Sequence, residues 1–434
     1  MTSSVAPADA AAFDLRSLLR ADDWIVCGQA AAEPLTLTRL LMNAGEGDAG
    51  TLPLTVFLGT TLSSTFDGDI PAGMRFASYG AMGRAASLAE RGLLDVLPER
   101  YGTLAGLFIE GALRADVVLL QVAPGGPTRP PSLGLANDYT LAAARRARVV
   151  VVEVNTSVPW THGAALPHDL HVDHWIAADR GPVELLPGAP GPIEEAIARH
   201  VASIVPDGAT LQTGIGNLPD AALRQLGGHR HLGIHSGVLG DAAAQLVRDG
   251  AVSNACKTID AGITVTNTVI GSAALYRWVD DNAAVEVRPA SYTHAAEVLG
   301  RLHRLCAVNA ALQVDLSGQV NCESVGGRQR GGVGGLLDFS RAARLSPGGR
   351  AITVLPATAD GGRQSRIVLD LAGNPATIGR ADVDLVVTEF GTADLRRATL
   401  DQRAQRLIAI AAPAFREALA RDWRNSTWGK KAWH

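Results

Sequence analysis

Two apolar, valine-rich runs constrain the fold of this 434-residue chain more than any other feature. They span residues 117–122 and 149–154, and residues 139–148 between them have a helical pattern. Runs that are mostly apolar are typical of strands buried on both faces, and a helix between two such strands connects them in parallel. Residues 24–27 and 54–59 have the composition of further strands. The sequence therefore predicts an α/β fold with largely parallel sheets.

A stretch rich in proline and glycine marks the boundary between two domains. Residues 181–192 contain four prolines and three glycines, a composition that interrupts helices and strands alike. We expect an N-terminal α/β domain over residues 1–188 and a second α/β domain over residues 189–434. Strands of the second domain are expected at residues 210–212, 231–234, 307–309, 351–355 and 385–388.

Charge and cysteine usage exclude several classes of function. The formal net charge is −4, so no basic face for nucleic acid is expected. The four cysteines show no CxxC spacing, which is typical of free thiols in a reducing compartment. Residues 1–22 have no apolar core of a secretory signal, and no window holds the roughly 18 apolar residues of a membrane helix. We therefore expect a cytoplasmic protein with no nucleic-acid or membrane partner.

A glycine-containing turn between a predicted strand and a predicted helix is the clearest candidate binding motif. Gly214 and Gly216 let the chain turn tightly, and Pro219 suits the first position of a helix, where no N–H is needed. Free N–H groups at such a helix start can bind phosphate or carboxylate. The motif lacks the lysine of a phosphate-binding P-loop and the third glycine of a dinucleotide fingerprint. Taken alone, it favours an ordinary strand-to-helix turn.

Further motifs along most of the chain point to a particular family. They are residues 26–29, 132–134, 138–140 and 161–163 in the N-terminal half, and 233–237, 320–324, 326–335, 353–356 and 388–396 in the C-terminal half. Together, and in this order, they resemble the acetyl-CoA hydrolase/transferase family, which includes the 4-hydroxybutyrate and succinyl-CoA:acetate CoA-transferases. The resemblance covers nearly the whole chain.

The resemblance implies a fold of two tandem CoA-transferase domains and an enzyme that acts on acyl-CoA thioesters as a homodimer. It implies no metal and no cofactor, since coenzyme A enters as part of the substrate. Backbone N–H groups of a glycine-rich loop would hold the oxyanion; the alternative for this loop is a flexible surface segment. The residues expected to contact coenzyme A are Gly214, Ile215, Gly216, Asn217, Leu218, Gly331, Gly332, Gly334 and Gly335.

One departure from the family pattern bears directly on the chemistry. Members that transfer coenzyme A carry a glutamate just after a His-Ser/Thr pair, and its carboxylate attacks the thioester. Here His235 and Ser236 are followed by Gly237, which has no side chain to act as nucleophile. The acyl–glutamyl anhydride and the glutamyl–CoA thioester of the usual covalent cycle are therefore not expected.

Two residues are candidates for the catalytic group that replaces this glutamate. Glu323, before the glycine-rich loop, can activate a water molecule if its surroundings raise the pKa of its carboxylate. The alternative is a structural carboxylate that caps the chain or pairs with an arginine such as Arg328. His235 is the second candidate base, although a histidine at a strand end is more often packed in the core.

Three hypotheses about function follow. In the first, the protein processes an acyl-CoA by hydrolysis or by attack of a group within the substrate. In the second, it is an acyl-CoA:carboxylate CoA-transferase in which another carboxylate, with Glu323 as first candidate, replaces the missing one. In the third, it is a non-catalytic CoA-binding subunit.

A cluster of histidines raises the question of a metal site. His162, His168, His171 and His174 are interleaved with two aspartates, and imidazole and carboxylate are metal ligands. The resemblance implies instead that His162 and His168 are structural residues near the domain interface. We therefore expect no metal.

Overall fold

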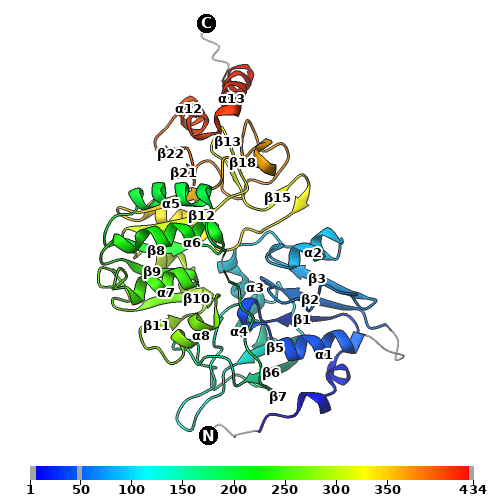
Figure 1. Ribbon diagram of the computed structural model, residues 1–434. Coiled ribbons are helices and arrows are strands. Elements are labelled where there is room, and N and C mark those ends of the chain that lie inside the picture. Colours follow the sequence, from blue (N-terminus) through cyan, green and yellow to red (C-terminus); the bar gives the residue numbers. More distant parts are fainter. Residues whose placement is uncertain (1–5, 46–50, 187, 430–434) are drawn as a thin grey trace.

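Two largely parallel sheets, each covered by helices, make up most of the molecule. The structure is a computed structural model that describes residues 6–45, 51–186 and 188–429. In Figure 1 the sheet of the N-terminal half lies beside that of the C-terminal half. This architecture confirms the predicted α/β class with largely parallel sheets.

The N-terminal sheet has seven parallel strands in the order β4-β3-β2-β1-β5-β6-β7. The two apolar runs form the neighbouring strands β5 (Val117–Val122) and β6 (Val149–Asn155). The other strands are β1 (Asp23–Cys27), β2 (Leu54–Leu58), β3 (Met74–Ser78), β4 (Leu94–Val96) and β7 (His174–Ala178). The α-helices are α1 (Leu35–Gly45), α2 (Ala85–Glu90), α3 (Leu104–Glu110) and α4 (Thr140–Ala144).

The helix between β5 and β6 is shorter than the sequence predicts. The prediction covered residues 139–148, whereas α4 ends at Ala144. The N–H groups of Arg148 and Val149 donate to the carbonyl oxygen of Asp116 at 2.9 and 3.1 Å. The chain has therefore already turned into β6 at these residues.

The C-terminal sheet has eight strands in the order β11-β10-β9-β8-β12-β17-β21-β22. Neighbouring strands are parallel except for the pair β21–β22, which is antiparallel. The strands are β8 (Thr210–Thr213), β9 (Gly233–Leu239), β10 (Thr264–Val269), β11 (Val285–Val287), β12 (Leu305–Ala310), β17 (Arg350–Val354), β21 (Leu385–Thr388) and β22 (Gly391–Asp394). The first helices of this half are α5 (Pro192–Ile204), α6 (Asn217–Arg224), α7 (Asp241–Arg248), α8 (Ala273–Val279), α9 (Ala290–Thr293), α10 (Ala296–Leu299) and α11 (Leu336–Leu345).

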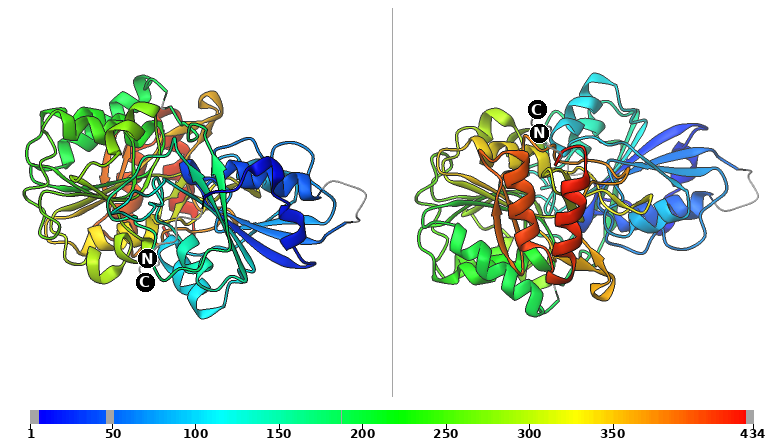
Figure 2. Two further views of the ribbon diagram at one scale, coloured as in Figure 1. Left: turned by 90° about the horizontal axis from the view of Figure 1, so that it is seen from below. Right: turned by 90° about the horizontal axis from the view of Figure 1, so that it is seen from above.

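A smaller layer completes the C-terminal half. Its strands are β13 (Gln313–Asp315), β14 (Val320–Asn321), β15 (Ser324–Val325), β16 (Arg328–Gln329), β18 (Thr358–Ala359), β19 (Gln364–Ser365) and β20 (Ile367–Val368). Helices α12 (Leu400–Ile410) and α13 (Pro413–Asn425) pack side by side over this end of the molecule (Figure 2, right). No helix in the described part of the chain combines the length and the apolar character that crossing a bilayer requires.

One strand boundary differs from its prediction in a way that matters for the site. The sequence predicts a strand over residues 231–234, but β9 begins at Gly233 and continues to Leu239. His231 has a φ of 57°, in the left-handed region, so the extended geometry cannot begin there. Gly237 therefore lies inside a strand that pairs with β10.

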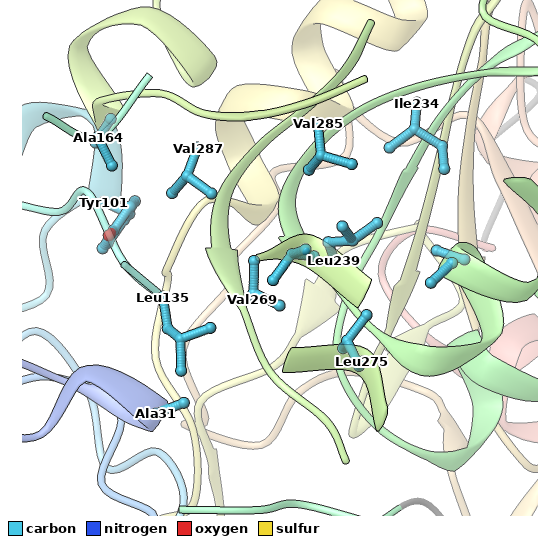
Figure 3. Close-up of a cluster of buried hydrophobic side chains, with 14 of the residues drawn as sticks. Ala31, Tyr101, Leu135, Ala164, Ile234, Leu239, Val269, Leu275, Val285 and Val287 are labelled. Carbon is cyan, nitrogen blue, oxygen red and sulfur yellow. The ribbon is translucent and has the colours of Figure 1, made fainter. Parts of the chain in front are cut away.

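A continuous hydrophobic core joins the two halves. Figure 3 shows members of one buried cluster from both halves, including Leu135 from the first and Val269 from the second. Backbone pairing continues the connection, because the N–H of Val269 donates to the carbonyl of Leu135 at 2.8 Å and that of Asn137 to the carbonyl of Asn267 at 3.0 Å. Residues 135–137 thus pair with the C-terminal end of β10.

A buried ion pair in the first half gives a stability prediction. Arg180 Nη2 lies 2.6 Å from Glu153 Oε1, and the Glu153 side chain is 0% exposed. Substitution Arg180→Met should lower the free energy of unfolding by about 3–5 kcal/mol, because it leaves a buried carboxylate without its partner. Arg341→Met removes a pair with Asp382 whose arginine is 51% exposed, and should cost less than about 1 kcal/mol. If urea denaturation gives the two variants the same loss of unfolding free energy, the buried pair is not more stabilising than the exposed one.

Candidate active site

A pocket of about 200 Å³ lies between the two halves, where strands of both sheets end. From the N-terminal sheet, Gln29, Thr60 and Tyr79 follow the ends of β1, β2 and β3. From the C-terminal sheet, Gly214 follows β8, and Asn309 is close to the end of β12. Ligands of parallel α/β folds bind outside the carboxyl ends of the strands. The pocket therefore has the position expected of an active site.

The lining of this pocket carries no carboxylate, lysine, arginine or thiol in the described part of the chain. Its polar side chains are Gln29, Thr60, Tyr79, Tyr101, Gln212, Thr213, Asn267, Thr268, His294 and Asn309. Its larger apolar side chains are Met82, Ile215, Val238, Ile270, Val333, Leu336 and Phe339. Such a pocket orients a ligand with a few neutral polar groups between apolar walls.

A chain of buried hydrogen bonds organises the polar wall. Tyr79 Oη donates to Gln29 Oε1 at 2.8 Å, and Gln29 Nε2 donates to Tyr101 Oη at 2.9 Å. Tyr101 Oη in turn donates to Asn267 Oδ1 of the C-terminal half at 2.7 Å. Burial, as the main cause, raises the pKa of Tyr79 and Tyr101 above the ordinary value, so both phenols stay protonated. The chain links the two halves through neutral groups.

Two helices begin at the pocket. Helix α11 starts after Gly335, and Gly335 and Leu336 both line the cavity. Helix α6 starts after Gly216, beside an adjoining cavity of about 100 Å³. The first N–H groups of a helix have no partner within it and attract negative charge. Both helix starts can therefore stabilise an anionic group of a ligand.

The residues expected to contact coenzyme A are placed in three different ways. Gly214 and Ile215 line both cavities, Gly334 and Gly335 line the larger one, and Gly216 and Asn217 line the smaller one. Leu218 packs against the hydrophobic core. Gly331 and Gly332 contact the backbone of the N-terminal half: the N–H of Ala81 donates to the carbonyl of Gly331 at 2.8 Å, and Gly80 forms a bridge to Gly332.

Gly237 faces a histidine that the sequence analysis did not identify. A Cβ atom added at Gly237 would lie 3.0 Å from Nε2 of His294, and one at Gly335 would lie 2.5 Å from the same atom. His294 follows α9 and is 5% exposed. Burial, with a contribution from His235, lowers the pKa of His294 to about 3. Nothing in the local sequence distinguishes this histidine; its position next to Gly237 is a property of the fold alone.

Glu323 and His235, the two predicted catalytic residues, are not among the residues that line the larger pocket. Glu323 Oε1 accepts a hydrogen bond from Thr377 Oγ1 at 2.8 Å. The carbonyl oxygen of Glu323 accepts the N–H groups of Arg330 and Gly331 at 2.7 and 2.9 Å. Glu323 is thus bonded to the base of the glycine-rich loop.

His235 is fully buried in β9 behind the pocket wall. Its Nε2 donates to the carbonyl oxygen of Thr293 at 3.1 Å. Burial, with repulsion from Lys257 as the next cause, lowers the pKa of His235 to about 4. His235 therefore supports the residue that precedes His294.

The clustered histidines are spread over the surface and the interface. His162 Nε2 lies 3.1 Å from Asp281 Oδ1, across the junction of the halves, and His171 Nε2 lies 3.2 Å from Asp173 Oδ1. The ring centroids of His174 and Phe13 lie 5.2 Å apart, with the ring planes tilted at 54° to each other. In residues 6–45, 51–186 and 188–429, no three metal-ligating side chains come together.

Comparisons with known proteins identify relatives over most of the chain. A family model, the acetyl-CoA hydrolase/transferase C-terminal domain, matches residues 271–423. The 4-hydroxybutyrate coenzyme A transferase of Clostridium kluyveri is 41% identical over 335 residues, which cover 77% of this chain and 78% of that protein.

Two solved structures are similar over almost the full length. RipA from Yersinia pestis has a TM-score of 0.88 and 31% identity, with 95% of this chain and 96% of that chain covered. The 4-hydroxybutyrate CoA-transferase of Porphyromonas gingivalis has a TM-score of 0.79 and 34% identity, with 96% and 97% covered.

The fit of the imidazole between two glycines gives a first prediction for this site. Gly335→Ala should lower the free energy of unfolding by about 1–3 kcal/mol, because its Cβ overlaps His294. Gly237→Ala should cost less, since its closest contact is longer. Gly106→Ala is a matched control in α3, where no atom lies within 4 Å of the added Cβ. Urea denaturation that gives Gly335→Ala and Gly106→Ala the same midpoint would contradict the proposed fit.

The buried neutral histidine gives a second prediction, on pH. The pKa of His294 is about 3 in the folded protein and near 6.5 in the unfolded chain, so the unfolded chain binds the extra proton as pH falls below 6.5. Its contribution to stability should therefore drop by about 2 kcal/mol between pH 7 and pH 5.

The difference between wild type and His294→Gln isolates this effect in denaturation at the two pH values. Buried carboxylates such as Asp138, whose pKa burial raises, act in the opposite direction in both proteins and cancel. An identical pH dependence of the two proteins would show that folding does not change the pKa of His294.

Proposed function

Because the chain belongs to the acetyl-CoA hydrolase/transferase family, we propose that it releases coenzyme A from an acyl-CoA without forming a glutamyl–CoA intermediate. The acyl group passes either to water or to a nucleophile within the acyl chain itself. One observation carries the proposal: no carboxylate is found among the described residues that line the pocket, which include Gly237 at the position where the resemblance puts the attacking glutamate.

The pocket has the features that thioester cleavage needs. Helix α11 begins at the cavity, where Gly335 and Leu336 line the wall, and the first N–H groups of a helix have no partner within it. Such donors can stabilise the oxyanion of a tetrahedral intermediate, with a typical effect of about 10²–10³ on rate for one donor. Val333 and Phe339 form part of an apolar wall, and a bound ligand that displaces water from such a wall strengthens these interactions.

A CoA-transferase with a replacement carboxylate is the second candidate. Glu323 precedes the glycine-rich loop in sequence, but its carboxylate is held by Thr377 and is absent from the pocket lining. Its use as nucleophile would require the segment of β14 and β15 to rearrange. A non-catalytic CoA-binding role is the third candidate, and it predicts binding without turnover.

The proposed chemistry needs no metal and no cofactor, because a base and oxyanion donors suffice for cleavage of a thioester. We also propose that the protein acts in the cytoplasm as a homodimer. Support for the dimer comes from the resemblance to the family, and exposed apolar side chains such as Leu186, at 67% exposure, offer contact area. Sedimentation of the purified protein tests the dimer.

Incubation with a panel of acyl-CoAs tests the proposed function. Free CoA thiol should appear with at least one acyl chain. In H₂¹⁸O, hydrolysis places one ¹⁸O in the released acid, whereas attack by a group within the acyl chain places none. Binding of acyl-CoA without thiol release from any chain would select the non-catalytic role.

A trapping experiment separates the first two candidates. Borohydride reduction or hydroxylamine treatment during turnover, followed by peptide mapping, should find no modified carboxylate. A modified Glu323 would replace the proposal by the transferase with a substitute nucleophile.

A further inference from the structure

We propose that His294 is the catalytic base of this site and that its Nε2 takes the proton of the nucleophile that attacks the thioester carbonyl. The inference rests on the proposed function and names the group that performs its proton transfer. It is carried by the space around the ring, by the bonding of Nδ1, and by the lack of another base in the described pocket lining.

The imidazole lies against the position from which a side chain at residue 237 would start. Nε2 is the closest atom to the Cβ positions of both Gly237, at 3.0 Å, and Gly335, at 2.5 Å. The ring fits here because both residues are glycine. No described residue forms a hydrogen bond with Nε2, and the ring lines the cavity. The atom that borders the vacant nucleophile position is therefore free to bind a substrate or a water molecule.

In the proposed role, the ring proton of His294 is on Nδ1, which lies next to Thr293. Thr293 Oγ1 lies 2.9 Å from Nδ1 of His294 and 3.4 Å from the carbonyl oxygen of Pro289. A hydroxyl has one proton, so both contacts are hydrogen bonds at once only if Oγ1 donates to Pro289 and accepts from Nδ1–H. A neutral imidazole with its proton on Nδ1 has a lone pair on Nε2. The pocket then faces a proton acceptor.

Residues from both halves hold the ring in this orientation. Tyr101 of the N-terminal half and Phe339 of α11 contact it edge-on, with centroid distances of 4.9 and 4.8 Å. His235 supports the segment from behind through the carbonyl of Thr293. Because burial lowers its pKa to about 3, His294 is neutral at physiological pH. The oxyanion that forms beside it raises its proton affinity during the reaction.

The proton transfer accompanies bond formation at the thioester. The nucleophile, either water or a hydroxyl or amine of the acyl chain, bonds to the carbonyl carbon while its proton passes to Nε2. The C–S bond then breaks, and the imidazolium returns the proton to the sulfur. Coenzyme A leaves as a free thiol, the acyl group stays on the nucleophile, and His294 is neutral again. No second substrate and no oxidant are needed.

Substitution His294→Gln tests this role. Glutamine can keep a hydrogen bond to Thr293 but cannot accept the proton, so kcat should fall by about 10²–10⁴, while KM changes less than about threefold. His171→Gln, at a side chain that is 86% exposed, is the matched control and should leave both constants unchanged. Retention of wild-type kcat in His294→Gln would overturn the proposal.

Chemical rescue distinguishes a base from a packing residue. His294→Gly opens a space for imidazole added to the solution. Added imidazole should restore part of kcat in proportion to the concentration of its neutral form. If His294 only packs against its neighbours, added imidazole should leave kcat unchanged. If circular dichroism shows that neither variant folds, two variants of Thr293 replace them. Thr293→Val removes the hydroxyl next to Nδ1 and should lower kcat, whereas Thr293→Ser keeps the hydroxyl and should preserve kcat.

A measurement on the unmodified protein separates this proposal from the proposed function. ¹⁵N NMR of histidine-labelled protein at pH 7 should show one buried ring with a protonated Nδ1 and an unprotonated Nε2, whose signal disappears or shifts in the residue 293 or 294 variants. A proton on Nε2 would overturn the assignment as base even if thiol is released. Absence of thiol release from every acyl-CoA would overturn the proposed function, and the ring assignment would still be decided.

Discussion

Backbone contact between the two halves is the constraint on which the rest of the site depends. Residues 135–137 pair with the end of β10, and Gly80 meets Gly332 so closely that a Cβ on Gly80 would lie 2.7 Å from the Cα of Gly332. Only glycine permits this approach on both sides. Since the walls of the pocket come from both halves, the pocket and the orientation of His294 exist only while this contact is closed.

The second property of the site is that the described side chains lining the pocket carry no formal charge. Gln29, Tyr101 and Asn267 form a chain of neutral hydrogen bonds, which satisfies groups that would be costly to bury alone. A carboxylate at residue 237 would border Nε2 and favour a proton on it by ionic attraction. Glycine at this position leaves the imidazole neutral. Residue 237 thus adds no carboxylate next to Nε2 of His294.

The strands of the sheets were largely predictable, because their apolar runs record burial on both faces. Residues 117–122 and 385–388 form β5 and β21 as predicted. The end of α4 and the start of β9 were not predictable, because they depend on a hydrogen bond to Asp116 and on the left-handed φ of His231. Local patterns carry no information about either.

The sequence by itself determined the α/β class, the family and the absence of a side chain at Gly237, because periodicity, motif order and residue identity are all local properties. The tertiary structure alone decided which groups face that glycine. It placed His294 in the pocket, His235 behind it and the Glu323 carboxylate against Thr377. Proton transfer depends on distances of a few ångströms between segments far apart in the chain, and only packing establishes such distances.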